Sequence, residues 1–188
     1  MSPRGTRDRM IDSAIVLMRE RGAAAVSIDA VLTHSGAPRG SVYHHFPGGR
    51  DELILAAGRR AADVISGLIS QAAEAGDARA AVERIAAFWK KVLVAGGFRA
   101  GCPIVALAVD ARADLPEAEA VVREAFERWQ GLLREAIEAA GVRTEEADEL
   151  AALVLAAIEG AVVLCRGKRS VEPLDVVTRR LVGLLPEG

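Results

Sequence analysis

The chain has 188 residues, of which 51% are hydrophobic and 27% are charged, a balance typical of a soluble protein with a packed core. It lacks both an apolar run near the ~20 residues of a transmembrane helix and the apolar stretch of a signal peptide, so we expect a cytoplasmic protein with no membrane partner. The net charge of −2 does not by itself favour nucleic-acid binding. However, residues 1–60 carry nine arginines against six acids, whereas residues 61–188 carry fifteen basic residues against twenty acids. This asymmetry predicts a basic N-terminal module on an acidic body, with chance clustering of surface charge as the alternative.

Helical spacing dominates the N-terminal part, and no stretch there alternates apolar and polar residues as a strand does. Apolar residues recur with helical spacing over 8–21, and Gly22 follows as a stop signal. Ser27 is a good N-cap for a second helix, which Gly36 would end. A third, very short helix fits residues 38–45. Three helices, with a glycine-containing turn between the second and third, match the helix-turn-helix plan.

The rest of the chain is predicted to form longer helices separated by glycines and prolines. We expect these helices over residues 50–74, 78–95, 103–111, 116–140, 145–166 and 173–185. The predicted fold is therefore all-α. We expect an N-terminal helix-turn-helix domain over 1–49 and a C-terminal helical-bundle domain over 50–188.

The third helix combines polar side chains with two apolar anchors. Its hydroxyl and imidazole groups suit phosphate oxygens and base edges, and they belong to Ser41, Tyr43, His44 and His45. Val42 and Phe46 lie four positions apart and can pin the helix from behind. Gly40 lets the backbone approach another surface, and Arg50 is placed to reach the DNA backbone from the start of the next helix.

Residues 36–53 read Gly-Ala-Pro-Arg-Gly-Ser-Val-Tyr-His-His-Phe-Pro-Gly-Gly-Arg-Asp-Glu-Leu and resemble the TetR family of transcriptional regulators. The Pro-Gly-Gly-basic run after Phe46, with Gly-Cys-Pro-Ile at 101–104, is similar to the branch that includes LmrA and YxaF. The resemblance is specific over residues 7–60. It implies an all-α homodimer that binds an operator in double-stranded DNA through its N-terminal domain and an effector through its C-terminal domain.

The resemblance also implies DNA contacts by position. Phosphates would be contacted by Ser27, Ser41, Tyr43, His45 and Arg50, and base edges would be faced by Arg39, Gly40 and His44. The chain departs from the family pattern at two positions. Pro38 stands where a Ser or Thr cap is common, and Ile28 stands where some relatives have a polar base reader.

A set of apolar and aromatic residues on three predicted helices is our prediction for the ligand site. The set is Trp89, Cys102, Val105, Leu107, Phe126, Trp129 and Leu133. Plain core packing is the alternative for each of them. Bundle interiors often bind small molecules, and the resemblance adds that effectors bind there. Because no charged residue is clearly committed to this interior, we expect a small apolar or aromatic effector.

The helix at 145–166 has small and apolar residues on a broad face, so it can pack closely against both the body and a second subunit. We expect a dimer interface at Leu150, Leu153, Val154, Ala157 and Ala161. The alternative is the central helix of a monomer.

An enzyme, a cofactor and a metal site are not expected, because the sequence has neither a nucleophile–base pair nor a cluster of metal ligands. Adjacent His44 and His45 point about 100° apart on a helix and are poor joint ligands. Cys102 and Cys165 are expected to be buried, with a redox role left open. The sequence therefore predicts a repressor that an effector releases from a near-palindromic operator. The alternative is an all-α small-molecule-binding protein without a DNA function.

Overall fold

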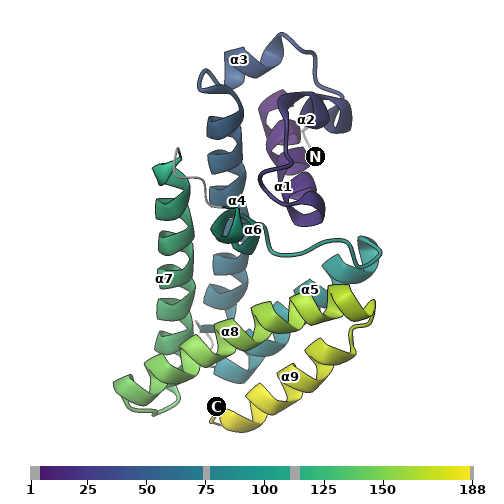
Figure 1. Ribbon diagram of the computed structural model, residues 1–188. Helices are drawn as coiled ribbons and strands as arrows, with labels where there is room; N and C mark the ends of the chain where they lie inside the picture. The colour runs from purple at the N-terminus through teal and green to yellow at the C-terminus, as the bar shows by residue number, and fades with distance from the viewer. Residues whose placement is uncertain (1–4, 74–76, 111–114, 187–188) are drawn as a thin grey trace. The chain divides into compact units, whose positions relative to one another are not determined.

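The computed structural model describes residues 5–73, 77–110 and 115–186, and the regular structure in these ranges is entirely helical (Figure 1). The predicted all-α fold is therefore confirmed. The helices are α1 (Thr6–Arg21), α2 (Ile28–Ser35), α3 (Ser41–His45), α4 (Gly49–Ala73), α5 (Ala78–Ala95), α6 (Pro103–Val109), α7 (Pro116–Ala139), α8 (Thr144–Lys168) and α9 (Glu172–Leu184). Their ends lie within two residues of the predicted ones, except that α3 begins later than expected. The residues before α3 form a turn, in which the amide of Ser41 donates to the carbonyl of Pro38 at 2.9 Å.

The chain divides into two compact units that differ from the predicted domains. The head unit holds the described residues of 1–62 and 102–123, and the body unit holds those of 63–101 and 124–188. The predicted boundary after residue 49 separated α4 from the head, whereas the first half of α4, all of α6 and the start of α7 belong to the head unit. Helices α4 and α7 each contribute residues to both units.

Local sequence signals account for the first two helices of the head unit. Helix α1 ends at Gly22, whose backbone has φ +85° and ψ 161°, a conformation that only glycine adopts readily. The hydroxyl oxygen of Ser27 accepts from the amide of Ala30 at 3.2 Å and caps α2. Gly36 ends α2 in the left-handed region, with φ +65°. The predicted cap and both predicted stops are confirmed.

Arginine side chains bind the first half of α4 to the head unit. Arg60 donates to the carboxylates of Asp8 and Asp12 on α1, at 3.2 Å in the case of Asp12. The hydrogen bond to Asp8 is the main cause that raises the pKa of the Arg60 guanidinium. Arg50, at the start of α4, binds backbone carbonyls in the head. These long-range bonds explain why the first half of α4 belongs to the head unit.

In the body unit, α5, α8 and α9 pack against one another (Figure 1). Trp89 of α5 and Trp129 of α7 are fully buried in its core. Lys90 of α5 forms an ion pair with Asp175 of α9. The Arg79 guanidinium donates to the carbonyl of Leu185 at 2.8 and 3.0 Å, which fastens the end of the chain to α5.

Helix α8 is long and apolar enough to cross a membrane by length and composition alone, with a mean hydropathy of 1.9 over 18 residues. The sequence predicted no membrane-spanning segment because it has no unbroken apolar run of that length. In α8, Glu159 interrupts the apolar stretch. One face of α8 is buried in the body unit, at Ala147, Ala151, Val154, Ile158, Ala161, Val162 and Cys165. Only 33% of this window is buried in the protein, and a single helix of this kind is not evidence of a membrane span, because core helices can have the same length and composition.

Candidate nucleic-acid interface

Helix α3 has an inner and an outer side. Val42 and Phe46 are fully buried, as the four-residue spacing predicted. The Arg7 guanidinium lies over the Phe46 ring, 5.1 Å from its centroid. On the outer side, Tyr43 is 67% exposed, and His44 is exposed as well. The two anchors thus hold a short helix whose polar groups face away from the head.

The hydroxyl groups of the two predicted phosphate-contacting serines differ in availability. Ser27 accepts from the amide of Ala30, so its own proton remains available for a phosphate oxygen. The Ser41 hydroxyl instead donates to the carbonyl of Pro38 at 2.6 Å. Pro38 therefore binds the Ser41 hydroxyl through its carbonyl, although its side chain has no group that could cap the helix. Ser41 could donate to a phosphate only after its hydroxyl rotates.

The neighbouring histidines are held as a pair on α3. The rings of His44 and His45 meet edge to face, with centroids 4.9 Å apart, and His45 is half-buried. Among the described residues, no group of three or more His, Cys, Asp or Glu side chains is placed to hold a metal ion. His44 thus remains the more accessible imidazole for a base edge.

Gly40 has no structural requirement for glycine within the chain. Its backbone lies in the right-handed helical region, with φ −66° and ψ −17°, which any residue adopts. A Cβ built on Gly40 would meet no heavy atom within 4 Å. The fold therefore leaves space at Gly40 that a larger side chain could fill.

Arg39, in the turn before α3, forms an ion pair with Asp29 in the first turn of α2. Their side chains are 78% and 70% exposed. Asp29 is the acid in the first turn of α2. Its pairing with Arg39 spans ten residues and had no local signal.

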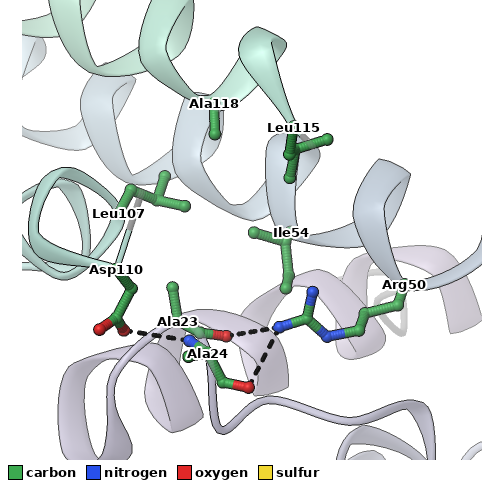
Figure 2. A pocket seen from close by; sticks show the side chains of 8 residues that line it. All are labelled: Ala23, Ala24, Arg50, Ile54, Leu107, Asp110, Leu115 and Ala118. Carbon is green, nitrogen blue, oxygen red and sulfur yellow. Dashed lines mark hydrogen bonds between the residues drawn. The ribbon is translucent and has the colours of Figure 1, made fainter. Parts of the chain in front are cut away.

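Arg50 has a different role from the predicted phosphate contact. Figure 2 shows its guanidinium turned toward the loop between α1 and α2. It donates to the carbonyls of Val26 at 2.6 Å, Ala23 at 2.8 Å and Ala24 at 3.3 Å. Its side chain is only 24% exposed. Arg50 therefore holds the loop, and a phosphate would have to compete with these carbonyls.

Asp110, which ends α6, binds the same loop as Arg50. Its carboxylate accepts from the amide of Ala24 at 3.0 Å (Figure 2). A Cβ at Gly22 would come within 2.8 Å of that carboxylate, so the contact needs glycine there. A cavity of about 20 Å³, with room for a water molecule, is lined by Ala23, Ala24, Arg50, Ile54, Leu107, Asp110, Leu115 and Ala118. No local pattern predicted that residues so far apart along the chain would meet.

The predicted ligand residues are divided between the two units. Cys102, Val105 and Leu107 belong to the head unit, whereas Trp89, Phe126, Trp129 and Leu133 belong to the body unit. In the body unit, the rings of Phe126 and Trp129 pack edge to face at 5.5 Å. A cavity of about 10 Å³ there is lined by Ile65, Ile85, Trp89, Trp129, Val154, Leu155, Ile158 and Glu159. As it stands, this cavity is no larger than a water molecule.

The predicted dimer residues lie on more than one face of α8. Val154 and Ala161 are 1% exposed and belong to the core of their own chain, so they are not on a face that a partner could reach. Leu150 and Ala157 are half-buried, and Leu153 is 46% exposed. The exposed side of α8 includes the small and apolar residues Ala152, Leu153, Ala156, Gly160, Val163 and Leu164. The helical spacing was predicted correctly, but it could not tell which of two apolar faces is inside.

Both cysteines are buried, as expected. Burial raises the pKa of the Cys165 thiol. The sequence neighbours of Cys102 are not basic, but α1 brings Arg19 close enough for a charge interaction with it. Burial is the larger effect on Arg19 and lowers the pKa of its guanidinium.

Comparisons with known proteins agree with this geometry. Residues 10–57 match the model of bacterial regulatory proteins of the tetR family, and residues 78–180 match the C-terminal domain of LmrA/YxaF-like transcriptional regulators. An HTH-type transcriptional regulator of Mycobacterium tuberculosis is 41% identical over 96% of this chain and 94% of its own length. The regulator LmrA of Bacillus subtilis is 28% identical over 98% of this chain and 99% of its own length.

Solved structures show the same fold. A TetR regulator from Legionella pneumophila superposes with a TM-score of 0.86 at 20% identity, covering 98% of this chain and 100% of its own. One from Rhodobacter sphaeroides has a TM-score of 0.83 at 22% identity, covering 96% and 98%. A small-molecule-binding protein without a DNA function would not account for the match over residues 10–57. The chain belongs to the TetR family of helix-turn-helix transcriptional regulators, in the LmrA/YxaF-like branch, and this family is not a class of enzymes.

Proposed function

We propose that this regulator is a cytoplasmic, homodimeric repressor that reads a near-palindromic operator and leaves it when a small apolar or aromatic effector binds. The observation that carries the proposal is the two-sided α3, in which buried Val42 and Phe46 anchor a helix with Tyr43 and His44 on its exposed side. Such neutral donors on a short, fixed helix suit DNA phosphates and base edges.

The contacts that we propose follow the availability of each group. Phosphates are contacted by Ser27, Tyr43 and His45, and by Ser41 once its hydroxyl rotates. Arg39 and His44 face base edges in the major groove. Gly40 lets the DNA come close, because its Cβ position is open. Arg50 is left out of this set, since its donors bind the loop carbonyls.

A second copy of the chain is the proposed partner of the exposed side of α8. Leu153, Val163 and Leu164 are about half exposed, which is unusual for apolar residues along one helix of a monomer. Small residues at 156 and 160 let a second helix approach closely. A twofold dimer would place two α3 helices about 34–36 Å apart, one turn of DNA, and so read a near-palindrome.

Sedimentation measures the dimer directly. Leu164→Glu places a charge on the proposed interface and should shift the protein toward monomer. Val94→Glu is a matched control, because Val94 is 60% exposed on α5 of the same unit. If both variants sediment as dimers, the exposed side of α8 is not the dimer interface.

The two tryptophans are the proposed core of the effector site. Trp89 and Trp129 line the small cavity of the body unit, and its other lining residues are apolar apart from Glu159. An effector must open this cavity, because drug-sized ligands occupy about 300–1,000 Å³. They are also the only tryptophans in the chain, so tryptophan fluorescence reports on this site alone. A thermal-shift screen of aromatic compounds should find a stabiliser that also changes this fluorescence.

Asp110 and α4 offer a route from effector to DNA. Helix α4 is continuous through residues of both units, so a change in the body unit can be carried along it. Asp110 ties α6 to the loop that precedes α2. The effector needs to favour the released state by only about 1–3 kcal/mol.

A mobility-shift assay with the DNA upstream of the regulator's own gene tests the proposed function. The protein should retard this duplex, and the effector found by thermal shift should release it. Retention of the complex at saturating effector would contradict release. Failure to retard any duplex would contradict operator binding.

A further inference from the structure

The pairing of Arg39 with Asp29 sets an acid beside the cation that we place at the base edges. Arg39 donates through Nη2 to one carboxylate oxygen of Asp29. Asp29 is itself fixed in the first turn of α2, where Ser27 caps the helix and the Thr33 hydroxyl donates to the Asp29 carbonyl at 2.8 Å. The helix therefore fixes the backbone of Asp29, and the guanidinium of Arg39 binds the carboxylate that extends from it.

This pair does little for the stability of the fold. Both side chains are more than two-thirds exposed, and exposed pairs contribute about 0–1 kcal/mol to folding. An acid at this position would also repel phosphate if it had no other effect. The ion pair instead affects the conformation of Arg39. One bond to Nη2 restricts the rotamers of its side chain, while most of the five guanidinium donors stay available for DNA.

We propose that Asp29 is a positioning residue that orients the planar fork of Arg39 toward a guanine in each operator half-site. Arginine reads guanine by two parallel hydrogen bonds to O6 and N7, which requires the fork to lie in the plane of the base. A freely rotating Arg39 would instead bind the nearest phosphate of any sequence. Asp29 thus converts a general DNA affinity into a preference for one base. This inference rests on the proposed operator reading by α3.

The experiment selects duplexes from a library with a randomised centre, using the full-length protein, and measures their affinities by fluorescence anisotropy. The variants are Asp29→Asn, Arg39→Ala, Arg39→Lys and the Asp29→Asn/Arg39→Ala pair. Asp63→Asn is the matched control, because Asp63 forms an exposed ion pair with Arg128 at 2.9 Å in the body unit. It changes the net charge equally without touching the head.

The wild-type protein should prefer guanine at one position of each half-site. Arg39→Ala should lower that preference by roughly 5- to 150-fold, and Arg39→Lys should also lower it although it keeps the charge. Asp29→Asn should lower the same preference at least about threefold while binding an unselected duplex as tightly as wild type or more tightly. In the Arg39→Ala background, Asp29→Asn should not lower the preference for guanine further. The control Asp63→Asn should leave this preference unchanged.

Two results would contradict the role of Asp29 without contradicting the proposed operator reading by α3. One is an Asp29→Asn variant that strengthens selected and unselected duplexes by the same factor, because Asp29 would then only repel DNA or withhold Arg39 from it. The other is a loss of preference that persists without Arg39. If the wild-type protein enriches no duplex, the proposed operator reading fails, and this inference fails with it.

Discussion

The turn before α3 contains Arg39, and the loop before α2 is contacted by Arg50 from the start of α4. The two arginines differ in their exposure and in their partners. Arg39 in the turn is 78% exposed and pairs with Asp29, which is 70% exposed. Arg50 at the loop is 24% exposed and donates to three backbone carbonyls. Both lie close to α3 in the sequence, so nearness along the chain did not separate them. Their partners do, because a guanidinium that satisfies partly buried carbonyls is part of the fold, and its removal lowers the stability of the protein.

The largest change to the loop should come from Gly22→Ala. Its backbone has φ +85°, and the added Cβ would lie 2.8 Å from the Asp110 carboxylate. We expect a loss of about 2–4 kcal/mol in the free energy of unfolding, measured by urea denaturation. Gly36→Ala is a control with φ +65° and an open Cβ position, so it should cost less. Equal losses would show that the Asp110 contact does not constrain the loop.

Arg50→Ala sharpens the comparison from the other side of the loop. Removal of the guanidinium takes this donor from the carbonyl of Val26 and leaves the carbonyl of Ala23 with only the amide of Val26, and we expect a loss of about 2–3 kcal/mol in the free energy of unfolding. Arg39→Ala, the matched control, should stay within about 0.5 kcal/mol of wild type. If Arg50→Ala is as stable as wild type but binds DNA with a weaker salt dependence, Arg50 is a phosphate contact after all.

Tyr43 and His44 should affect DNA binding in different ways. Tyr43→Phe removes one hydroxyl and should weaken all duplexes alike, by about 1 kcal/mol or fivefold. His44→Ala should instead change the preferred sequence at one position of each half-site, as duplex selection would record. An equal effect of the two variants on sequence preference would contradict this division of roles.

Gly40→Ala should have the smallest effect on the fold and a clear effect on binding. The position has an ordinary helical backbone and no neighbour within 4 Å, so alanine should be neutral or should stabilise the protein by about 0.4–1 kcal/mol. Its methyl group would stand where DNA comes close, and the affinity for a selected duplex should fall. Unchanged affinity would show that DNA does not approach Gly40.

Short-range patterns predicted much of the fold. The cap at Ser27, the stop at Gly36 and the anchors Val42 and Phe46 each depend on residues at most four positions away, and each is confirmed. The helix boundaries follow from the same periodicity. Such patterns are carried by the sequence itself, because 3.6 residues per turn fix which side chains share a face.

Long-range pairings could not be predicted in this way. The contact of Asp110 with the amide of Ala24 joins residues 86 positions apart, and nothing in the neighbourhood of either residue signals it. The role of Arg50 depends on where the loop carbonyls lie. On α8, Val154 and Leu153 are equally apolar, yet one is in the core and the other is exposed. Periodicity gives the faces of a helix, and only packing decides which face is inside.

The salt dependence of DNA binding tests most directly whether the exposed side of the head reads DNA while Arg50 stays in the fold. With Arg50 excluded from the phosphate contacts, the other cations of the head set the slope of log K against log salt, which should be negative. Arg50→Ala should keep this slope. A flat response of the wild-type protein, or a slope that falls by about two with Arg50→Ala, would contradict the account.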